Sequence, residues 1–172
     1  MVLLPRMAFT DAGEGARVVR SLVRQYDEVS QSLDPILLPT DLLSAALPLR
    51  ISVQARRGLL IVPLWFEWDG ERFWCATQGD AAVVVALQDT PRCAFDLSTN
   101  DMPYRGIRGR GDVHIRPELG GVTLDRLIDR YRIDRDSKLA KWLLSRRASE
   151  VAIEITPTWQ TGWDYSERMA QR

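Results

Sequence analysis

PLWFEWDGERFWCATQGDAAVVVALQDTP, residues 63–91, decides the fold, because it runs from one strand pattern through a second strand pattern into a helix pattern. The run that ends in PLWF and the run ERFWCAT (71–77) are rich in aromatic and other strand-favouring residues. Asp69-Gly70 separates the two runs, and this pair is a strong signal for a tight hairpin turn. The stretch therefore predicts an antiparallel hairpin whose second strand leads directly into a helix.

The junction between that second strand and the helix is Thr77–Asp80, where the free backbone amides of a helix start can face a ligand. We expect AAVVVALQ (81–88) to be helical, with Asp80 as its N-cap. Pro63 has no amide hydrogen to give to a ladder, so we expect its strand to be unpaired or bulged there. Both features would leave polar main-chain atoms free beside the junction.

Outside this stretch, the same periodicities predict further strands and helices. The predicted strands are LRISVQA (49–55), LLIVPLWF (59–66), ERFWCAT (71–77), RCAFDLS (92–98), YRGIRGRGDVHI (104–115) and VAIEITP (151–157). The predicted helices are 13–31, 41–47, 81–88, 124–133 and 137–147. The turn residues Arg56-Arg57-Gly58 suit a second hairpin, and the glycines of 104–115 suit a bend or bulge. We therefore expect a six-stranded antiparallel β-barrel with flanking helices, in the mainly β (α+β) class.

The charge of the chain is balanced, with 23 basic and 23 acidic residues. This balance argues against a general nucleic-acid or anionic-membrane surface, and we expect neither as a partner. Arginine supplies 21 of the basic residues, so we expect arginine rather than lysine wherever a phosphate is held. No apolar run approaches the roughly 18 residues that a membrane span needs.

The cysteine and histidine content favours a reduced protein without a structural metal. Cys75 and Cys93 both fall in predicted strands, where two buried free thiols are the favoured interpretation and a disulfide between neighbouring strands is the alternative. His114, the single histidine, cannot form a metal site alone. Residues 1–10 lack the pattern of a cleaved signal peptide, so we expect a cytoplasmic protein.

The order and spacing of several short motifs resemble one protein family. The motifs are Val62-Pro63-Leu64-Trp65-Phe66, Asp69-Gly70, Thr77, Leu87, Pro91, Pro103-Tyr104, Gly111 and the segment from Pro157 through Trp163-Asp164-Tyr165-Ser166. Together they resemble the pyridoxamine 5′-phosphate oxidase-like family, the split β-barrels that bind FMN or the deazaflavin F420, over roughly residues 41–166. The resemblance implies a split-barrel domain over 39–172, preceded by an N-terminal helical extension over 1–38. It also implies a homodimer with cofactor sites at the subunit interface.

The resemblance further implies which residues bind the cofactor. They are Pro63, Trp65, Thr77, Gln78, Tyr104, Arg105 and Trp163. Thr77 falls on the family's phosphate-contacting threonine. Ala82-Val83 stand where phosphate-binding members carry Arg-Lys, and two charge-assisted contacts of roughly 1.5–3 kcal/mol each are missing. An Asp80 cap would also repel a phosphate, so the alternative for Gln78-Gly79-Asp80 is a capped turn without a ligand.

Other side chains can compensate for the missing cations or form the wall of a site. Arg56, Arg57, Arg105, Arg108 and Arg110 are either a replacement anion clamp or solvated surface residues. Six tryptophans are either core and dimer contacts or, for Trp65 and Trp163 above all, an aromatic wall against a ring.

Two functions remain open from the sequence. The first is an FMN- or F420-binding oxidoreductase-like protein that transfers hydride to or from a small-molecule substrate through the cofactor ring, without a nucleophile–base pair of its own. The alternative is a non-catalytic split-barrel module that has lost the flavin phosphate site and binds haem or another planar ligand, or acts as an interaction domain through its N-terminal helix.

Overall fold

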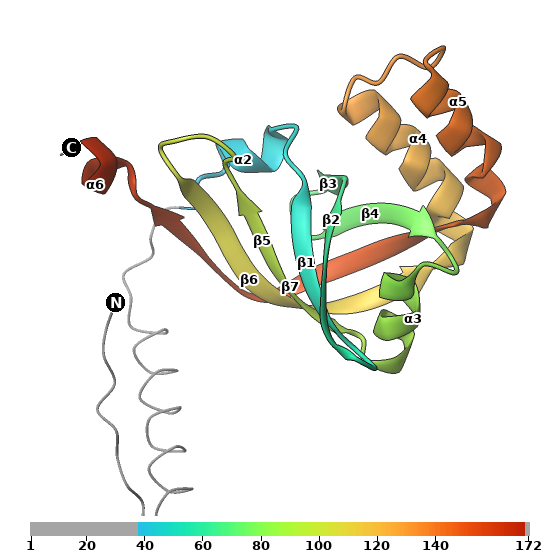
Figure 1. The fold of residues 1–172 in the computed structure, drawn as a ribbon, viewed down its shortest axis with the longest axis horizontal. Coiled ribbons are helices and arrows are strands. Elements are labelled where there is room, and N and C mark those ends of the chain that lie inside the picture. The colour runs from blue at the N-terminus through green and yellow to red at the C-terminus, as the bar shows by residue number, and fades with distance from the viewer. Residues whose placement is uncertain (1–37, 171–172) are drawn as a thin grey trace, which may run out of the picture. The chain divides into compact units, whose positions relative to one another are not determined.

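The computed structural model describes residues 38–170, which form a curled antiparallel sheet flanked by helices (Figure 1). The predicted helix 13–31 lies outside the described residues. The strands are β1 (Leu49–Ala55), β2 (Gly58–Leu64), β3 (Phe66–Trp68), β4 (Phe73–Gln78), β5 (Arg92–Ser98), β6 (Arg105–Arg116) and β7 (Glu150–Asp164). The helices are α2 (Asp41–Ser44), α3 (Ala82–Asp89), α4 (Gly120–Arg130), α5 (Lys138–Ser145) and α6 (Ser166–Ala170), with short 3₁₀ turns η1 (Pro117–Leu119) and η2 (Arg147–Ser149).

The sheet has seven strands in the order β2-β1-β5-β6-β7-β4-β3, and each pair is antiparallel. Along β1, β4, β5 and the first half of β7, buried residues alternate with less buried ones or run continuously, as expected for strands with one face in a core. Fully buried side chains on the concave face include Ile51, Phe66, Phe73, Leu97 and Ile153. The barrel architecture and the α+β class are confirmed.

The prediction of six strands is wrong by one, because the run 59–66 divides at Trp65. Up to Leu64 the chain pairs with β1, and from Phe66 it pairs with β4. Pro63 stands in regular register opposite Arg50, so the expected unpaired or bulged position there is also wrong. Among the described strands β2 forms a sheet edge, where a residue without an amide hydrogen disturbs no ladder.

The turn chemistry predicted from the sequence is confirmed. Gly58 and Gly70 have φ angles of 118° and 106°, in the region that only glycine adopts without strain. Gly58 closes the β1–β2 hairpin and Gly70 lies in the β3–β4 hairpin. The predicted irregularity in 104–115 is a register shift between Arg110 and Gly111 in the β6–β7 ladder.

Helix α3 forms as expected, but its predicted cap is wrong. The N-cap residue is Ala81, which has extended backbone angles and no side-chain capping bond. Asp80 is exposed in the preceding turn, where the amide of Ala81 donates to the carbonyl of Gln78 at 3.0 Å. This turn moves the helix start one residue beyond the reach that an Asp80 cap needs.

Helices α4 and α5 add a second apolar layer outside the barrel core. Helix α4 packs on β4 and β7 and buries Leu124, Leu127 and Ile128 there. Gly120 at its start lies against the backbone of β7, because an added Cβ would fall 1.9 Å from the carbonyl oxygen of Glu150. Only glycine allows this close approach, which fixes α4 on the sheet.

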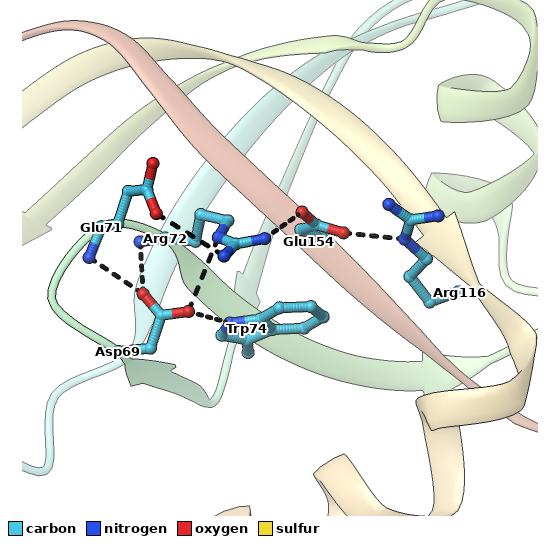
Figure 2. A network of polar contacts seen from close by, with 6 residues as sticks. All are labelled: Asp69, Glu71, Arg72, Trp74, Arg116 and Glu154. Carbon is cyan, nitrogen blue, oxygen red and sulfur yellow. Dashed lines mark hydrogen bonds and ion pairs between the residues drawn. The ribbon is translucent and has the colours of Figure 1, made fainter.

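A buried carboxylate on the outer face of the sheet links β6, β7 and the loop of the β3–β4 hairpin (Figure 2). Glu154 on β7 is 4 % exposed and accepts bonds from Arg72 at 2.9 Å and from Arg116 at 2.7 Å. Arg72 lies beside the β3–β4 hairpin, where Asp69 accepts from the indole of Trp74 at 2.7 Å. Burial alone would raise the pKa of Glu154, but the two guanidinium groups outweigh it and hold that pKa below the ordinary 4.5.

The remaining sequence expectations concern thiols, metals and membranes. Cys75 and Cys93 are free and buried, which confirms the favoured interpretation. Burial raises the pKa of Cys93 to about 12 and that of Cys75 further. Among residues 38–170 no three acidic, cysteine or histidine side chains gather to hold a metal. Within the same residues, no helix is long and apolar enough to cross a membrane.

We predict that Glu154→Gln lowers the free energy of unfolding by roughly 1.5–3 kcal/mol at pH 7, the value of a lost charge-assisted bond. Because the folded-state pKa of Glu154 is lowered, its contribution is complete above the unfolded pKa and is lost as the pH falls through the folded pKa. Urea unfolding at pH 7 and in acid measures both. Glu71→Gln, at an exposed partner of Arg72, is the control and should change little. An equal deficit at both pH values would contradict the charge argument.

Candidate functional site

A cavity of about 320 Å³ lies where the β2–β3 break, the end of β4 and the two helices α4 and α5 meet. It is lined by Pro63, Leu64, Trp65, Ala76, Thr77, Gln78, Leu124, Leu127, Leu139, Trp142, Leu143, Arg146 and Glu150. Its size falls at the lower end of the roughly 300–1,000 Å³ of small-molecule sites. Most of the wall is apolar, and the polar groups come from the end of β4, the start of β7 and the residue after α5.

The aromatic wall of the cavity is fixed by Tyr131, the residue after α4. Its ring stacks on Trp65 with 4.9 Å between centroids and 18° between planes. Its hydroxyl donates to the carbonyl of Leu47 at 2.7 Å and accepts from the amide of Phe66 at 3.2 Å. Burial raises the pKa of Tyr131, so the hydroxyl keeps its proton for the bond to Leu47. Trp65 is therefore held in one orientation at the strand break.

The polar wall is centred on Glu150, which pairs with Gln78 across the β4–β7 ladder and is 6 % exposed. The Gln78 amide group donates to a carboxyl oxygen of Glu150, and the Gln78 carbonyl accepts from the Ser149 hydroxyl at 2.7 Å. Burial raises the pKa of Glu150, and the bond from Gln78 and the positive charge of Arg146 oppose this only in part. The cavity thus contains a carboxyl group that takes up a proton more readily than an exposed one.

Arg146 and Trp142 form the outer part of the same cavity. The Arg146 guanidinium carbon lies 4.5 Å from the centroid of the Trp142 indole, a cation–π geometry. Trp142 is 54 % exposed. A flat ligand would meet indole and leucine surfaces, with a guanidinium at one end and an amide–carboxyl pair at the other.

Four of the seven predicted site residues share this cavity: Pro63, Trp65, Thr77 and Gln78. The other three lie at the opposite end of β6 and β7. Tyr104 lines a hollow beside α6, and the ring of Trp163 covers Gly106, whose added Cβ would fall 2.6 Å from it. Arg105 donates twice to Asp41, at 3.0 and 2.6 Å. Within one subunit these three residues do not join the cavity, and a role for them in cofactor binding stays a prediction.

The arginines proposed as a replacement clamp do not line the cavity either. Arg56 lies 3.9 Å from Asp89, and it borders a separate hollow of about 480 Å³ together with Arg57 and Ala82. Arg108 and Arg110 both point outward from β6 on one face, as predicted.

Sequence reasoning missed Glu150, Trp142 and Arg146 as parts of the cavity. Glu150 follows from the β4–β7 register, which the sequence does not give. Trp142 and Arg146 are four residues apart, so they share one face of α5 and its end, and this spacing was a usable signal.

Comparisons with solved structures identify the fold. An F420 reductase superposes with a TM-score of 0.62 at 25% identity, over 74% of this chain and 98% of that one. A protein of the pyridoxinephosphate oxidase family from Clostridium acetobutylicum, related to general stress protein 26, gives 0.56 at 15%, over 73% and 85%. A haem storage protein from Vibrio cholerae gives 0.55 at 10%, over 73% and 90%. The chain folds as a pyridoxamine 5′-phosphate oxidase-like split β-barrel. No family model matches the chain, and no curated protein matches its sequence.

The start of α3 in this split barrel is built for packing rather than for an anion. Val83 is 4 % exposed and belongs to the barrel core, while Ala82 is exposed beside the hollow with Arg56 and Arg57. An Arg-Lys pair in place of Ala82-Val83 would therefore put the arginine charge on the surface and the lysine charge in the core.

We predict that Val83→Lys destabilises the protein by on the order of 3 kcal/mol or more, because it buries a charge without a partner. Ala82→Arg, one residue earlier and exposed, is the matched control and should change the free energy of unfolding by less than about 0.5 kcal/mol. Thermal and chemical unfolding measure both variants. Equal stability of the two would show that the start of α3 has room for a lysine.

Proposed function

We propose that the cavity binds the ring of a flavin or deazaflavin and that the protein is an oxidoreductase that uses this ring. The observation that carries the proposal is the convergence of Pro63, Trp65, Thr77 and Gln78, two separate sequence segments, on one largely apolar cavity. The resemblance of the sequence motifs and the likeness to an F420 reductase support the same function.

The residues of the cavity fit a planar heteroaromatic ring. Trp65 and Trp142 offer aromatic faces, and the buried Leu124 and Leu127 of α4 add apolar surface to the wall. Gln78 and Glu150 offer hydrogen-bonding groups for a polar ring edge. When bound, the ring supplies hydride chemistry, and the protein binds it, orients it and excludes water.

Of the two cofactors, we favour the deazaflavin F420. The support is the F420 reductase, which at 25% identity matches this chain over nearly its own full length. The sequence alone left FMN and F420 open, and the apolar Ala82-Val83 pair weakens the case for a flavin phosphate at α3.

We further propose that the protein is a homodimer in which the partner completes the site. Tyr104, Arg105 and Trp163 lie at the far end of the β6–β7 ladder from Glu150, so only a second subunit can bring such residues to the cavity. The outer face of β2 is an apolar stripe in which Leu59 is 76 % and Ile61 68 % exposed. The stripe leads to Pro63 on the cavity wall, which suits an interface beside the site.

The alternative of a haem-binding module has the haem storage protein as its support. Iron is commonly held by histidine, cysteine, methionine or tyrosine. None of these four residue types lines the cavity among the described residues. His114 is exposed on β6 opposite Glu154, outside the cavity, so the geometry favours the ring of a flavin type over haem.

We predict that F420 binds the purified protein and quenches tryptophan fluorescence, and that Trp65→Leu lowers the affinity at least tenfold by removing the stacking face. FMN is titrated in parallel. Trp74→Phe, at an indole outside the cavity that bonds to Asp69, is the control and should bind like the wild type. Failure of both F420 and FMN to bind, with haem bound instead, would overturn the proposal.

We predict that sedimentation equilibrium at micromolar concentration gives a dimer and that Ile61→Glu gives a folded monomer, because the substitution places a charge in the apolar stripe. Val122→Glu, at an exposed apolar residue of α4, is the control and should leave the dimer intact. A monomeric wild-type protein would remove the partner residues from the site.

A further inference from the structure

We infer that Arg146 binds the anionic group of the ligand, in place of the cation pair that is absent at Ala82-Val83, and that Glu150 couples this binding to proton uptake. The inference rests on the proposed function, because it assigns the charged end of the ligand whose ring the cavity takes. It places that end beside α5 rather than at the start of α3.

Arg146 is placed and oriented by contacts on both sides. Its backbone carbonyl accepts from the Ser149 amide at 3.0 Å and from the Gln78 side chain at 3.5 Å, which ties the end of α5 to the end of β4. Its guanidinium group rests on the Trp142 indole at 4.5 Å. A cation–π contact uses none of the guanidinium N–H groups as hydrogen-bond donors, and a guanidinium fork suits the oxygens of a phosphate or carboxylate.

Arg146 is also unpaired among the described residues, because no carboxylate there forms an ion pair with it. The next residue differs in this respect. Arg147 donates twice to Asp125, at 2.9 and 2.8 Å, and does not line the cavity. Two adjacent arginines thus have different partners, and only the unpaired one faces the cavity.

Glu150 is the only other charged side chain on the cavity wall among the described residues. The groups around it are the Gln78 amide from β4 and the Arg146 guanidinium from the end of α5. Helix α4 contributes Leu124 and Leu127, and the β2–β3 break contributes Pro63, Leu64 and Trp65, all uncharged. An anion that binds Arg146 removes the charge that opposes protonation of Glu150, so binding raises the pKa of Glu150 further.

The sign of the pH dependence follows from this coupling. Below the pKa of free Glu150 the carboxyl is neutral, and the anion binds most tightly. As the pH rises from that pKa through the higher pKa of the bound state, the affinity for the anion falls, because binding then requires Glu150 to take up a proton from solution. The phosphate of FMN has its own ionisation near pH 6, which in the free ligand is common to all titrations. Titration of riboflavin, which has no phosphate, and of FMN on the wild type and on Glu150→Gln therefore separates the ionisation of the phosphate from that of Glu150.

The test compares FMN with riboflavin, which has the same ring and no phosphate, and repeats the titration with F420. We expect Arg146→Met to weaken FMN and F420 by roughly ten- to a hundredfold and to leave riboflavin unchanged. Arg146→Lys should fall between, because the point charge remains and the fork is lost. Arg147→Met is the neighbouring control, and Arg57→Met tests the rival place beside α3. Neither should weaken FMN. Circular dichroism confirms that each variant is folded.

The proton coupling has its own readout. Wild-type affinity for FMN should fall relative to Glu150→Gln as the pH rises from 5 to 8, and calorimetry in buffers of different ionisation enthalpy should show proton uptake only with Glu150 present. Equal affinities for riboflavin and FMN, equal losses of both in Arg146→Met, or a loss confined to Arg57→Met would overturn the inference and leave the proposed function standing. If no ring ligand binds the wild type, both fail together.

Discussion

The structure depends on one aromatic side chain that bridges the two layers. Tyr131 bonds to the carbonyl of Leu47 before β1 and to the amide of Phe66 at the start of β3, and its ring stacks on Trp65. Its neighbour Arg130 lies over the ring of Phe66 and donates to the carbonyl of Leu43 in α2 and to that of Ala45 just after it. These contacts fix the break at Trp65, where the chain passes from β2, which pairs with β1, into β3, which pairs with β4. Pro63, Leu64 and Trp65 at this break form one side of the cavity wall.

The two faces of the sheet differ in the residues that they bury. The concave face is an apolar core. On the outer face, β7 carries two buried carboxylates, Glu150 and Glu154, which are four residues apart. Glu154 is matched by two guanidinium groups, and its pKa is lowered. Glu150 receives one amide and a single cation, and its pKa is raised. The same residue type on the same strand is thus structural at one position and chemically poised at the other, and the difference lies in the number of positive groups around it.

Local sequence patterns predicted most of the barrel, because turn glycines mark the hairpins and alternating apolar residues mark the strands. Residues close together in the sequence were enough to predict the hairpins at Gly58 and Gly70, the irregularity of β6 and the apolar face of α4. The break at Trp65 was not, because it depends on Tyr131, 66 residues away. The prediction of Asp80 as the N-cap was wrong because the preceding turn moves the start of α3 by one residue, to an Ala81 cap. The family resemblance identified Pro63 and Thr77 as site residues, whereas Glu150 required the β4–β7 register, which only the folded chain defines.

The helical pair α4–α5 is inserted between two strands that are already joined along their length. Strands β6 and β7 pair from Arg105 opposite Asp164 to Arg116 opposite Ala152, so the ladder between them is complete without the helices. The insertion supplies much of the cavity wall and has its own buried residues outside the barrel core. Substitutions at its cavity-lining residues away from Arg130 and Tyr131, such as Leu139 and Trp142, can therefore reshape the cavity at little cost to the barrel. The shape of the cavity is thus freer to diverge than the architecture of the sheet.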